Sequence, residues 1–230
     1  MRLSLASATL AVLGASFIAT PASADVYGVA YYGLRGSYVW TDEGSTHGSM
    51  LFDYNEEYSE GFGAAVYIGW ILDDNFRLEM EGGYRSADLD RVVIVRDDLL
   101  FTTPGDVVGV GGDAQVGTAM VNLYYDIHLV DDASLLPWIG AGLGGAFVDY
   151  SVDAFVPGTS VILFDAKDQT WAFAYQFMAG FTFPVGDGMS MSLSYHYFRT
   201  EDFVYVDAFG EEFETDLEQH SIDLGFQFHL

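Results

Sequence analysis

The sequence predicts an all-β protein, an eight-stranded antiparallel transmembrane up-and-down β-barrel with long external loops. Three observations predict it. Segments of suitable length alternate between apolar and polar side chains, the connections between them are short and long in turn, and the final segment has one apolar face. A tilted transmembrane strand needs roughly 9–11 residues, with outward side chains in lipid and inward side chains in a polar interior.

The final segment, residues 219–230, shows the clearest alternation in the chain. One face holds Ile222, Leu224, Phe226, Phe228 and Leu230, and the other holds Ser221, Asp223, Gly225, Gln227 and His229. A period of two indicates a strand with one apolar and one polar side. Because an open aromatic edge strand promotes aggregation, we expect this strand to pair with the first strand and close a barrel.

We expect the other seven strands at about 29–40, 61–72, 76–84, 115–129, 136–150, 171–185 and 189–199. In each of them, large apolar side chains alternate with polar, charged or small ones. Short connections are expected at 73–75, 130–135 and 186–188, and long ones at about 41–60, 86–114, 151–170 and 200–218. Outer-membrane barrels have this arrangement, with short periplasmic turns and long external loops.

A soluble barrel of the lipocalin type is the alternative architecture, because it also consists of alternating strands. It would direct its large apolar side chains inward and its charged side chains outward. The apolar final strand and the export signal at the start of the chain favour the membrane barrel.

The first residues predict export. Arg2 supplies a positive charge, residues 3–19 are apolar or small, and residues 21–24 form a small-residue cleavage site. We therefore expect a signal peptide at residues 1–24, an outer-membrane β-barrel domain at residues 25–230, and a location in the outer membrane of a Gram-negative cell. An uncleaved helical anchor is the alternative, and the short apolar stretch disfavours it.

Composition excludes several classes of function. The chain has 8 basic and 34 acidic residues and a net charge of −26, so it lacks the basic residues that contact nucleic-acid phosphates. An aromatic content of 16% argues against a disordered chain. The absence of cysteine excludes disulfides and a lipid-modified cysteine. We expect no cofactor.

Five segments resemble one family. They are AMVNLYYDI at 119–127, PWIGAGLG at 137–144, FAYQFMAGFTF at 173–183, LSYHYF at 193–198 and HSIDLGFQFHL at 220–230. In order and spacing they resemble the opacity-type or surface-antigen outer-membrane β-barrels of Gram-negative bacteria, relatives of the N-terminal barrel of outer membrane protein A. The resemblance spans nearly all of the expected mature chain.

The resemblance implies an eight-stranded barrel with variable surface loops. Members of that family act as surface antigens, adhesins or small porin-like proteins, so no catalytic residues are implied. Expected partners are outer-membrane lipid, lipopolysaccharide, the barrel-assembly machinery, and a host or surface ligand bound by the loops. Family members usually end in Phe, so the assembly signal here is assigned to Phe226, Phe228 and Leu230.

The candidate site is a lumen polar network on the expected inner faces. Its members are Arg35, Arg77, Glu79, Glu81, Arg85, Asp126, His196 and Asp223. The interior of an eight-stranded barrel is only wide enough for side chains, and buried charges must pair or form hydrogen bonds. We expect the network to plug the barrel. The alternative is a small porin-like channel in which Arg–Glu pairs exchange partners.

The residues offer two further kinds of chemistry. Ser194 and His196, with Asp223 as an orienting partner, have a spacing similar to that of outer-membrane lipid hydrolases. They point into the lumen, where a lipid cannot reach, so we expect no enzymatic activity. The acidic loops at about 42–60 and 201–218 offer oxygen ligands of the kind Ca²⁺ and Mg²⁺ prefer, but without EF-hand spacing, so we expect no specific metal site.

Three more expectations concern packing. The interfacial aromatic girdles are assigned to Tyr38, Trp40, Trp70, Tyr84, Trp138 and Trp171. The glycines at 140, 142 and 144 are expected to make room in the lumen for longer neighbours such as Tyr67 or the arginines. The second long loop is expected to form a hairpin that prolongs strands three and four, with an exposed apolar tip for a partner as the alternative.

Overall fold

The computed structural model describes residues 30–42, 44–48, 52–97, 107–128, 135–155, 162–206 and 212–230. The expected signal peptide, the turn at 130–134 and the tip of the second long loop lie outside these residues. Within the described ranges, no helix is long and apolar enough to cross a membrane.

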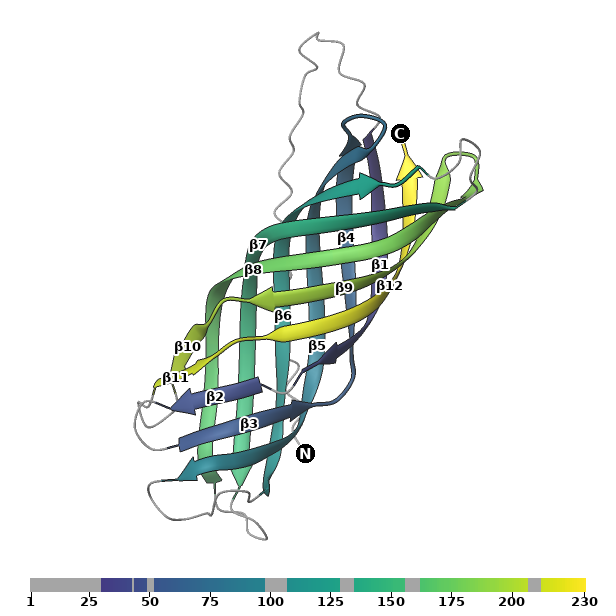
Figure 1. The fold of residues 1–230 in the computed structure, drawn as a ribbon. Helices are drawn as coiled ribbons and strands as arrows, with labels where there is room; N and C mark the ends of the chain where they lie inside the picture. Colours follow the sequence, from purple (N-terminus) through teal and green to yellow (C-terminus); the bar gives the residue numbers. More distant parts are fainter. Residues whose placement is uncertain are drawn as a thin grey trace, which may run out of the picture.

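Eight antiparallel strands form a closed barrel, which confirms the predicted fold class (Figure 1). They are β1 (Ala30–Thr41), β4 (Gly61–Ile71), β5 (Phe76–Asp97), β6 (Val107–Asp126), β7 (Leu136–Phe155), β8 (Ile162–Gly186), β9 (Met189–Thr200) and β12 (Glu218–His229). The ladder runs from β5 through β4, β1, β12, β9, β8 and β7 to β6, and the pairing of β5 with β6 closes it. As predicted, the last strand pairs with the first, with Tyr38 opposite Ile222.

The strands continue into regions that the sequence assigns to long loops. β5 and β6 still pair at Val92 and Val108, so the hairpin expected for the second loop is confirmed. Four short strands, β2 (Gly44–Gly48), β3 (Phe52–Tyr58), β10 (Phe203–Val206) and β11 (Glu212–Thr215), occupy parts of the first and last loops. They lie at the end of the barrel opposite the C-terminus (Figure 1). Continued pairing supplies hydrogen-bond partners to backbone groups that an irregular loop would leave to water.

The short connections are built by local turn chemistry. The backbone amides of Asn75 and Phe76 donate to the Asp73 carboxylate at 2.8 and 2.7 Å, and this caps the turn between β4 and β5. Gly188 has a positive φ of 70°, which the tight turn between β8 and β9 requires and glycine adopts without strain. These connections define the short-turn end of the barrel, and β2, β3, β10 and β11 mark the long-loop end.

The two faces of the wall differ in polarity. Large apolar side chains are exposed on the outer surface, among them Leu34, Phe62, Val66, Ile139, Leu143, Phe177 and Leu193. The buried positions include arginines, carboxylates, amides and hydroxyls. A soluble lipocalin-like barrel would have the opposite distribution, so the structure supports the membrane-barrel alternative.

The position predicted for one girdle residue is wrong. Trp138 lies inside the barrel and is 5% exposed, with its indole Nε1 donating to Thr182 at 3.0 Å and its ring 5.1 Å from that of Tyr124. The reason is its position in the alternation, because Trp138 shares the inward face of β7 with Gly140 rather than the outward face with Ile139. The aromatic residues Tyr38 and Trp171 are 54% and 69% exposed, as a lipid-facing girdle requires.

The inner glycines of β7 make room for different neighbours from those expected. A Cβ at Gly140 would meet Tyr124, and one at Gly142 would meet Asn122, both of which lie on β6. The expected neighbour Tyr67 instead lies over Gly33 of β1. The expectation is wrong because antiparallel register brings β6 side chains directly opposite the β7 glycines.

Candidate functional site

All eight members of the predicted lumen network lie inside the barrel, and none is more than 7% exposed. β5 contributes Arg77, Glu79, Glu81 and Arg85, because side chains two residues apart share one face of a strand. Arg35 comes from β1, Asp126 from β6, His196 from β9 and Asp223 from β12. Side chains from five strands therefore converge in one polar interior.

The tightest contact of the network lies at the short-turn end. The Arg77 guanidinium donates through Nε and a terminal nitrogen to the two Asp126 oxygens, at 2.7 and 2.8 Å. Arg77 also donates to the Tyr31 hydroxyl at 3.2 Å, and its charge lies 5.0 Å from the centre of the Tyr124 ring. This two-bonded geometry is the strongest form of an arginine–carboxylate pair.

Arg35 occupies the middle of the lumen between two carboxylates. Its terminal nitrogens lie 3.5 Å from Glu79 and 3.2 Å from Glu81. Tyr31 donates a hydrogen bond of 2.8 Å to Glu79, and Tyr67 faces the Arg35 guanidinium at 5.0 Å. The charges of Arg35 and Arg77 are therefore balanced by adjacent carboxylates, as buried charges require.

Uncharged side chains extend the network toward the long-loop end. Asn122 donates to Glu81 at 3.1 Å, and Gln176 donates to Asn122 at 2.8 Å. Arg85 in turn donates to Gln176 at 3.4 Å. The candidate set from the sequence omits Tyr31, Asn122 and Gln176 because it contains only arginines, carboxylates and histidine. Their inward position in the alternation was the signal available for finding them.

The serine, histidine and aspartate of the hydrolase alternative lie close together in the lumen. Ser194 Oγ is 3.0 Å from His196 Nε2, and the Asp223 carboxylate is 3.6 Å from the same nitrogen. A nucleophile–base–orienter relay needs the serine and the carboxylate on different ring nitrogens. Here both face Nε2, which also lies 3.3 Å from Arg35. The geometry therefore does not match serine activation and fits a packed interior.

Part of the lumen is less completely paired. Among the described residues, buried polar atoms with no hydrogen-bond partner include Arg85 Nη1, His196 Nδ1, Gln219 Oε1 and Asp223 Oδ1. These residues lie toward the long-loop end. At the short-turn end, a cavity of about 300 Å³ opens beside Arg77, Asp126 and His229. The ion pairs between Arg35, Glu79 and Glu81 separate the two regions.

The residues assigned to the assembly signal lie on the outer side of the last strand. Phe226 is paired with Leu34 and Phe228 with Tyr32, and the rings of Phe228 and Tyr32 stack at 5.4 Å. Leu230 is 76% exposed, and its amide donates to the Ala30 carbonyl at 2.9 Å. Their role as an assembly signal stays a prediction.

Comparison with known proteins identifies one family model. The model of the outer membrane protein beta-barrel domain matches residues 8–229, which is nearly the whole chain. Uncharacterized proteins of Brucella abortus, Brucella suis and Brucella melitensis are 32% identical over 130 residues. The match covers 50% of this chain and 44% of theirs, so the chain spans less than half the length of these curated relatives.

Solved structures share the fold at low sequence identity. The outer membrane protein OprG of Pseudomonas aeruginosa is 12% identical with a TM-score of 0.56, covering 89% of this chain and 98% of its own. The Escherichia coli outer membrane protease OmpT is 7% identical with a TM-score of 0.52, covering 91% and 99%. Neisserial surface protein A is 12% identical with a TM-score of 0.50, covering 87% and 97%. At these identities the likeness shows the fold alone.

Proposed function

Because the chain belongs to the outer membrane protein β-barrel family, we propose that it is a surface protein of the Gram-negative outer membrane with a plugged lumen. Its role is structural or interactive, in envelope integrity, surface recognition or adhesion. The observation that supports this most directly is the chain of ion pairs from Asp126 through Arg77 and Glu79 to Arg35 and Glu81. It fills the middle of a barrel whose strand number already limits its bore.

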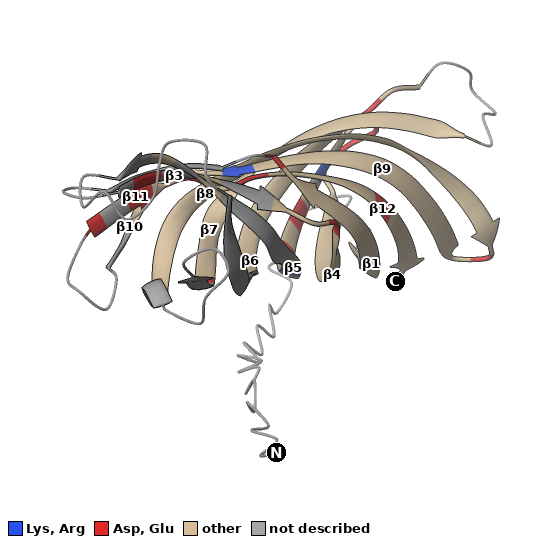
Figure 2. Cartoon of the chain, turned by 90° about the horizontal axis from the view of Figure 1, so that it is seen from below, with Lys and Arg blue, Asp and Glu red and all other residues tan. Residues whose placement is uncertain are grey.

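The long-loop end is the surface offered to partners in this proposal. By the usual orientation of such barrels, it faces outward from the cell. Acidic positions occur on the strands at this end, near β10 and β11 (Figure 2). The charge of this surface favours a positively charged protein surface as a partner, and lipopolysaccharide as a partner bridged by divalent cations.

The proposal predicts little ion conduction. We expect the folded protein in planar lipid bilayers to give no conductance steps, or only small and flickering ones, because Arg35 and the carboxylates of Glu79 and Glu81 block the bore. A wide porin inserted in parallel serves as the control for membrane insertion. A large, stable open pore from the folded protein would overturn the plugged-lumen proposal.

A small porin-like channel is the second candidate. The partner-free polar atoms of Arg85 and Asp223, together with the cavity beside Arg77, favour it, because such groups suit a water-filled path. The path would have to cross the Arg35 ion pairs, which lie between the two regions. In the variant Glu81→Gln, one partner of Arg35 loses its charge. Single-channel conductance steps that differ in size between this variant and the wild type would support the channel instead of the plug.

The proposal assigns no catalytic role to the protein. Ser194 and His196 are buried in the lumen, and their geometry differs from that of an activated serine. The other parts of the proposal, export by a signal peptide, membership of the opacity type, and the assembly role of Phe226, Phe228 and Leu230, rest on the sequence patterns described above.

A further inference from the structure

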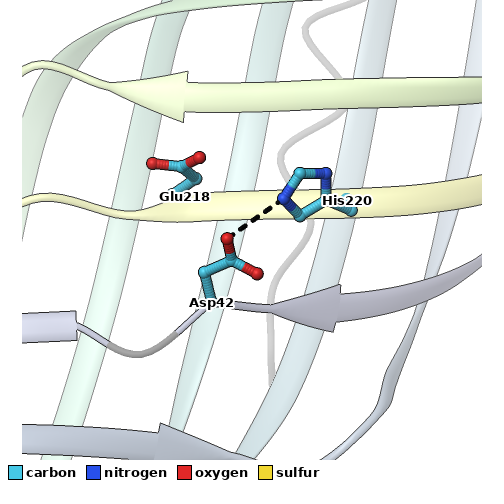
Figure 3. A group of neighbouring side chains, drawn as sticks. All are labelled: Asp42, Glu218 and His220. Carbon is cyan, nitrogen blue, oxygen red and sulfur yellow. Dashed lines mark hydrogen bonds and ion pairs between the residues drawn. The ribbon is translucent and has the colours of Figure 1, made fainter.

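Three side chains with metal-ligating atoms meet on the outer surface where β1 ends and β12 begins. Trp40 is paired with His220, and the Asp42 amide donates to the Glu218 carbonyl at 3.0 Å. This register places the side chains of Asp42, Glu218 and His220 side by side (Figure 3). All three belong to the long-loop end, outside the lumen network.

The distances between the donor atoms are close to those of a metal site. One donor atom from each of the three side chains lies within 4.8 Å of the other two. His220 Nε2 is 3.3 Å from an Asp42 oxygen. Tetrahedral ligands of Zn²⁺ at about 2.0–2.2 Å are themselves separated by roughly 3.3 Å. Closing the Glu218 carboxylate on the other two ligands by about 1–2 Å would complete a three-ligand site.

The imidazole is held with Nε2 toward the carboxylates. On one side, Tyr195 Oη lies 2.5 Å from His220 Nδ1. The ring also stacks on Trp40, with centroids 5.7 Å apart and planes 12° from parallel. A metal-bound histidine almost always donates its second ring N–H to an oxygen, which fixes the tautomer and the orientation of the ring. Tyr195 is placed to accept that hydrogen bond.

Arg199, a basic side chain that contacts Glu218, is engaged mainly elsewhere. Arg199 contacts Asp216 through two nitrogens, at 2.8 and 2.9 Å. Its distance to Glu218 is longer, 3.5 Å. The Tyr197 hydroxyl also forms a hydrogen bond with the Glu218 carboxylate. Together with Asp42, Glu218 concentrates negative charge around the Nε2 atom of His220.

We propose that Asp42, Glu218 and His220 bind one divalent first-row transition-metal ion, with Zn²⁺ as the reference ion. One imidazole nitrogen and two carboxylates suit such an ion, whereas Ca²⁺ and Mg²⁺ take oxygen ligands. Three protein ligands leave a coordination position open to an oxygen ligand from outside the protein. The site is independent of whether the lumen is plugged.

Zn²⁺ titration of the folded full-length protein in metal-free detergent buffer tests the proposal. We expect one tight site and a loss of affinity of about tenfold or more in Asp42→Asn, Glu218→Gln and His220→Gln. Tyr195→Phe should lose about tenfold, because the ring loses its orienting partner. His229→Gln, at the other end of the same strand, is the matched control and should bind as the wild type does.

A second readout identifies the nitrogen ligand. The electron paramagnetic resonance spectrum of bound Cu²⁺ should show coupling to one imidazole nitrogen, which His220→Gln abolishes and His229→Gln retains. Different migration of unboiled and boiled samples in SDS establishes that each variant is folded.

Three outcomes would overturn the proposal. They are no tight Zn²⁺ binding by the wild type, equal binding by folded His220→Gln, and displacement of Zn²⁺ by equimolar Ca²⁺. In the first two cases, Asp42 and His220 form only a hydrogen-bond chain with Tyr195 on an acidic surface. In the third case, the carboxylates bind cations without the imidazole.

Discussion

Arg77→Met is expected to destabilise the folded barrel by about 3–5 kcal/mol, because it leaves the buried Asp126 carboxylate without its partner. The two short hydrogen bonds between these side chains, at 2.7 and 2.8 Å, disappear together. The measurement is the free energy of unfolding in urea, followed by tryptophan fluorescence in lipid vesicles. The double variant Arg77→Met/Asp126→Asn should lose less than Arg77→Met alone, because no carboxylate is then left unpaired.

The chain offers a matched control for this experiment. Arg199 makes a similar two-nitrogen contact with Asp216, but its side chain is 40% exposed. An exposed pair contributes about 1 kcal/mol or less, so Arg199→Met should change the free energy of unfolding little. Equal losses in Arg77→Met and Arg199→Met would show that burial does not set the strength of the Arg77–Asp126 pair, which contradicts our description of the lumen.

Gly144→Ala is expected to give the second largest effect, a loss of about 1–3 kcal/mol or a failure to fold. A Cβ at this position would overlap the backbone carbonyl oxygen of Ala119 and lie 2.8 Å from the Cα of Met120. Backbone atoms of a neighbouring barrel strand cannot move aside as the end of a flexible side chain can. The fraction of refolded protein that resists SDS before boiling measures the effect.

Gly82→Ala is the control for that substitution. It also lies in a barrel strand, but a Cβ there would have no heavy atom within 4 Å apart from its chain neighbours. We expect it to fold as the wild type does. If Gly144→Ala refolds to the same extent and unfolds at the same urea concentration as Gly82→Ala, β6 and β7 are packed less closely than the structure indicates.

Local alternation explains why much of the barrel could be predicted from the sequence. A period of two assigns each side chain of a strand to one face, so the inward positions of Arg35, Glu79 and Asp223 follow from their neighbours. Trp138 shows how the same rule can be misapplied. Its aromatic character predicts a girdle position, whereas its place two residues before Gly140, on the same face of β7, puts it in the lumen. Where residue type and position in the alternation disagree within a regular strand, the position determines which face the side chain occupies.

Contacts between side chains on different strands could not be predicted in the same way. The pairing of Arg77 with Asp126 depends on the register between β5 and β6, and the room at Gly142 depends on the register between β6 and β7. The cluster of Asp42, Glu218 and His220 joins the two ends of the chain through the β1–β12 register. The alternation in the sequence determines which face of its strand each side chain occupies. It does not determine the register between two strands, because turns and packing across the barrel set that register.

The extended loop strands show a further limit. The sequence places residues 151–155 and 162–170 in a long loop, yet they continue β7 and β8, whereas residues 86–97 continue β5 as the expected hairpin requires. Above a bilayer, a strand needs no apolar outer face, since water can solvate it. The apolar alternation therefore marks the expected membrane-crossing part of each strand and not the strand's full length.

Membrane fractionation followed by an SDS gel of unboiled and boiled samples tests the membrane-barrel assignment most directly. After expression of the full chain in a Gram-negative host, we expect the protein in the outer-membrane fraction, with different migration before and after boiling because the closed barrel resists the detergent. Recovery from the soluble periplasmic fraction, with identical migration of both samples, would contradict the assignment.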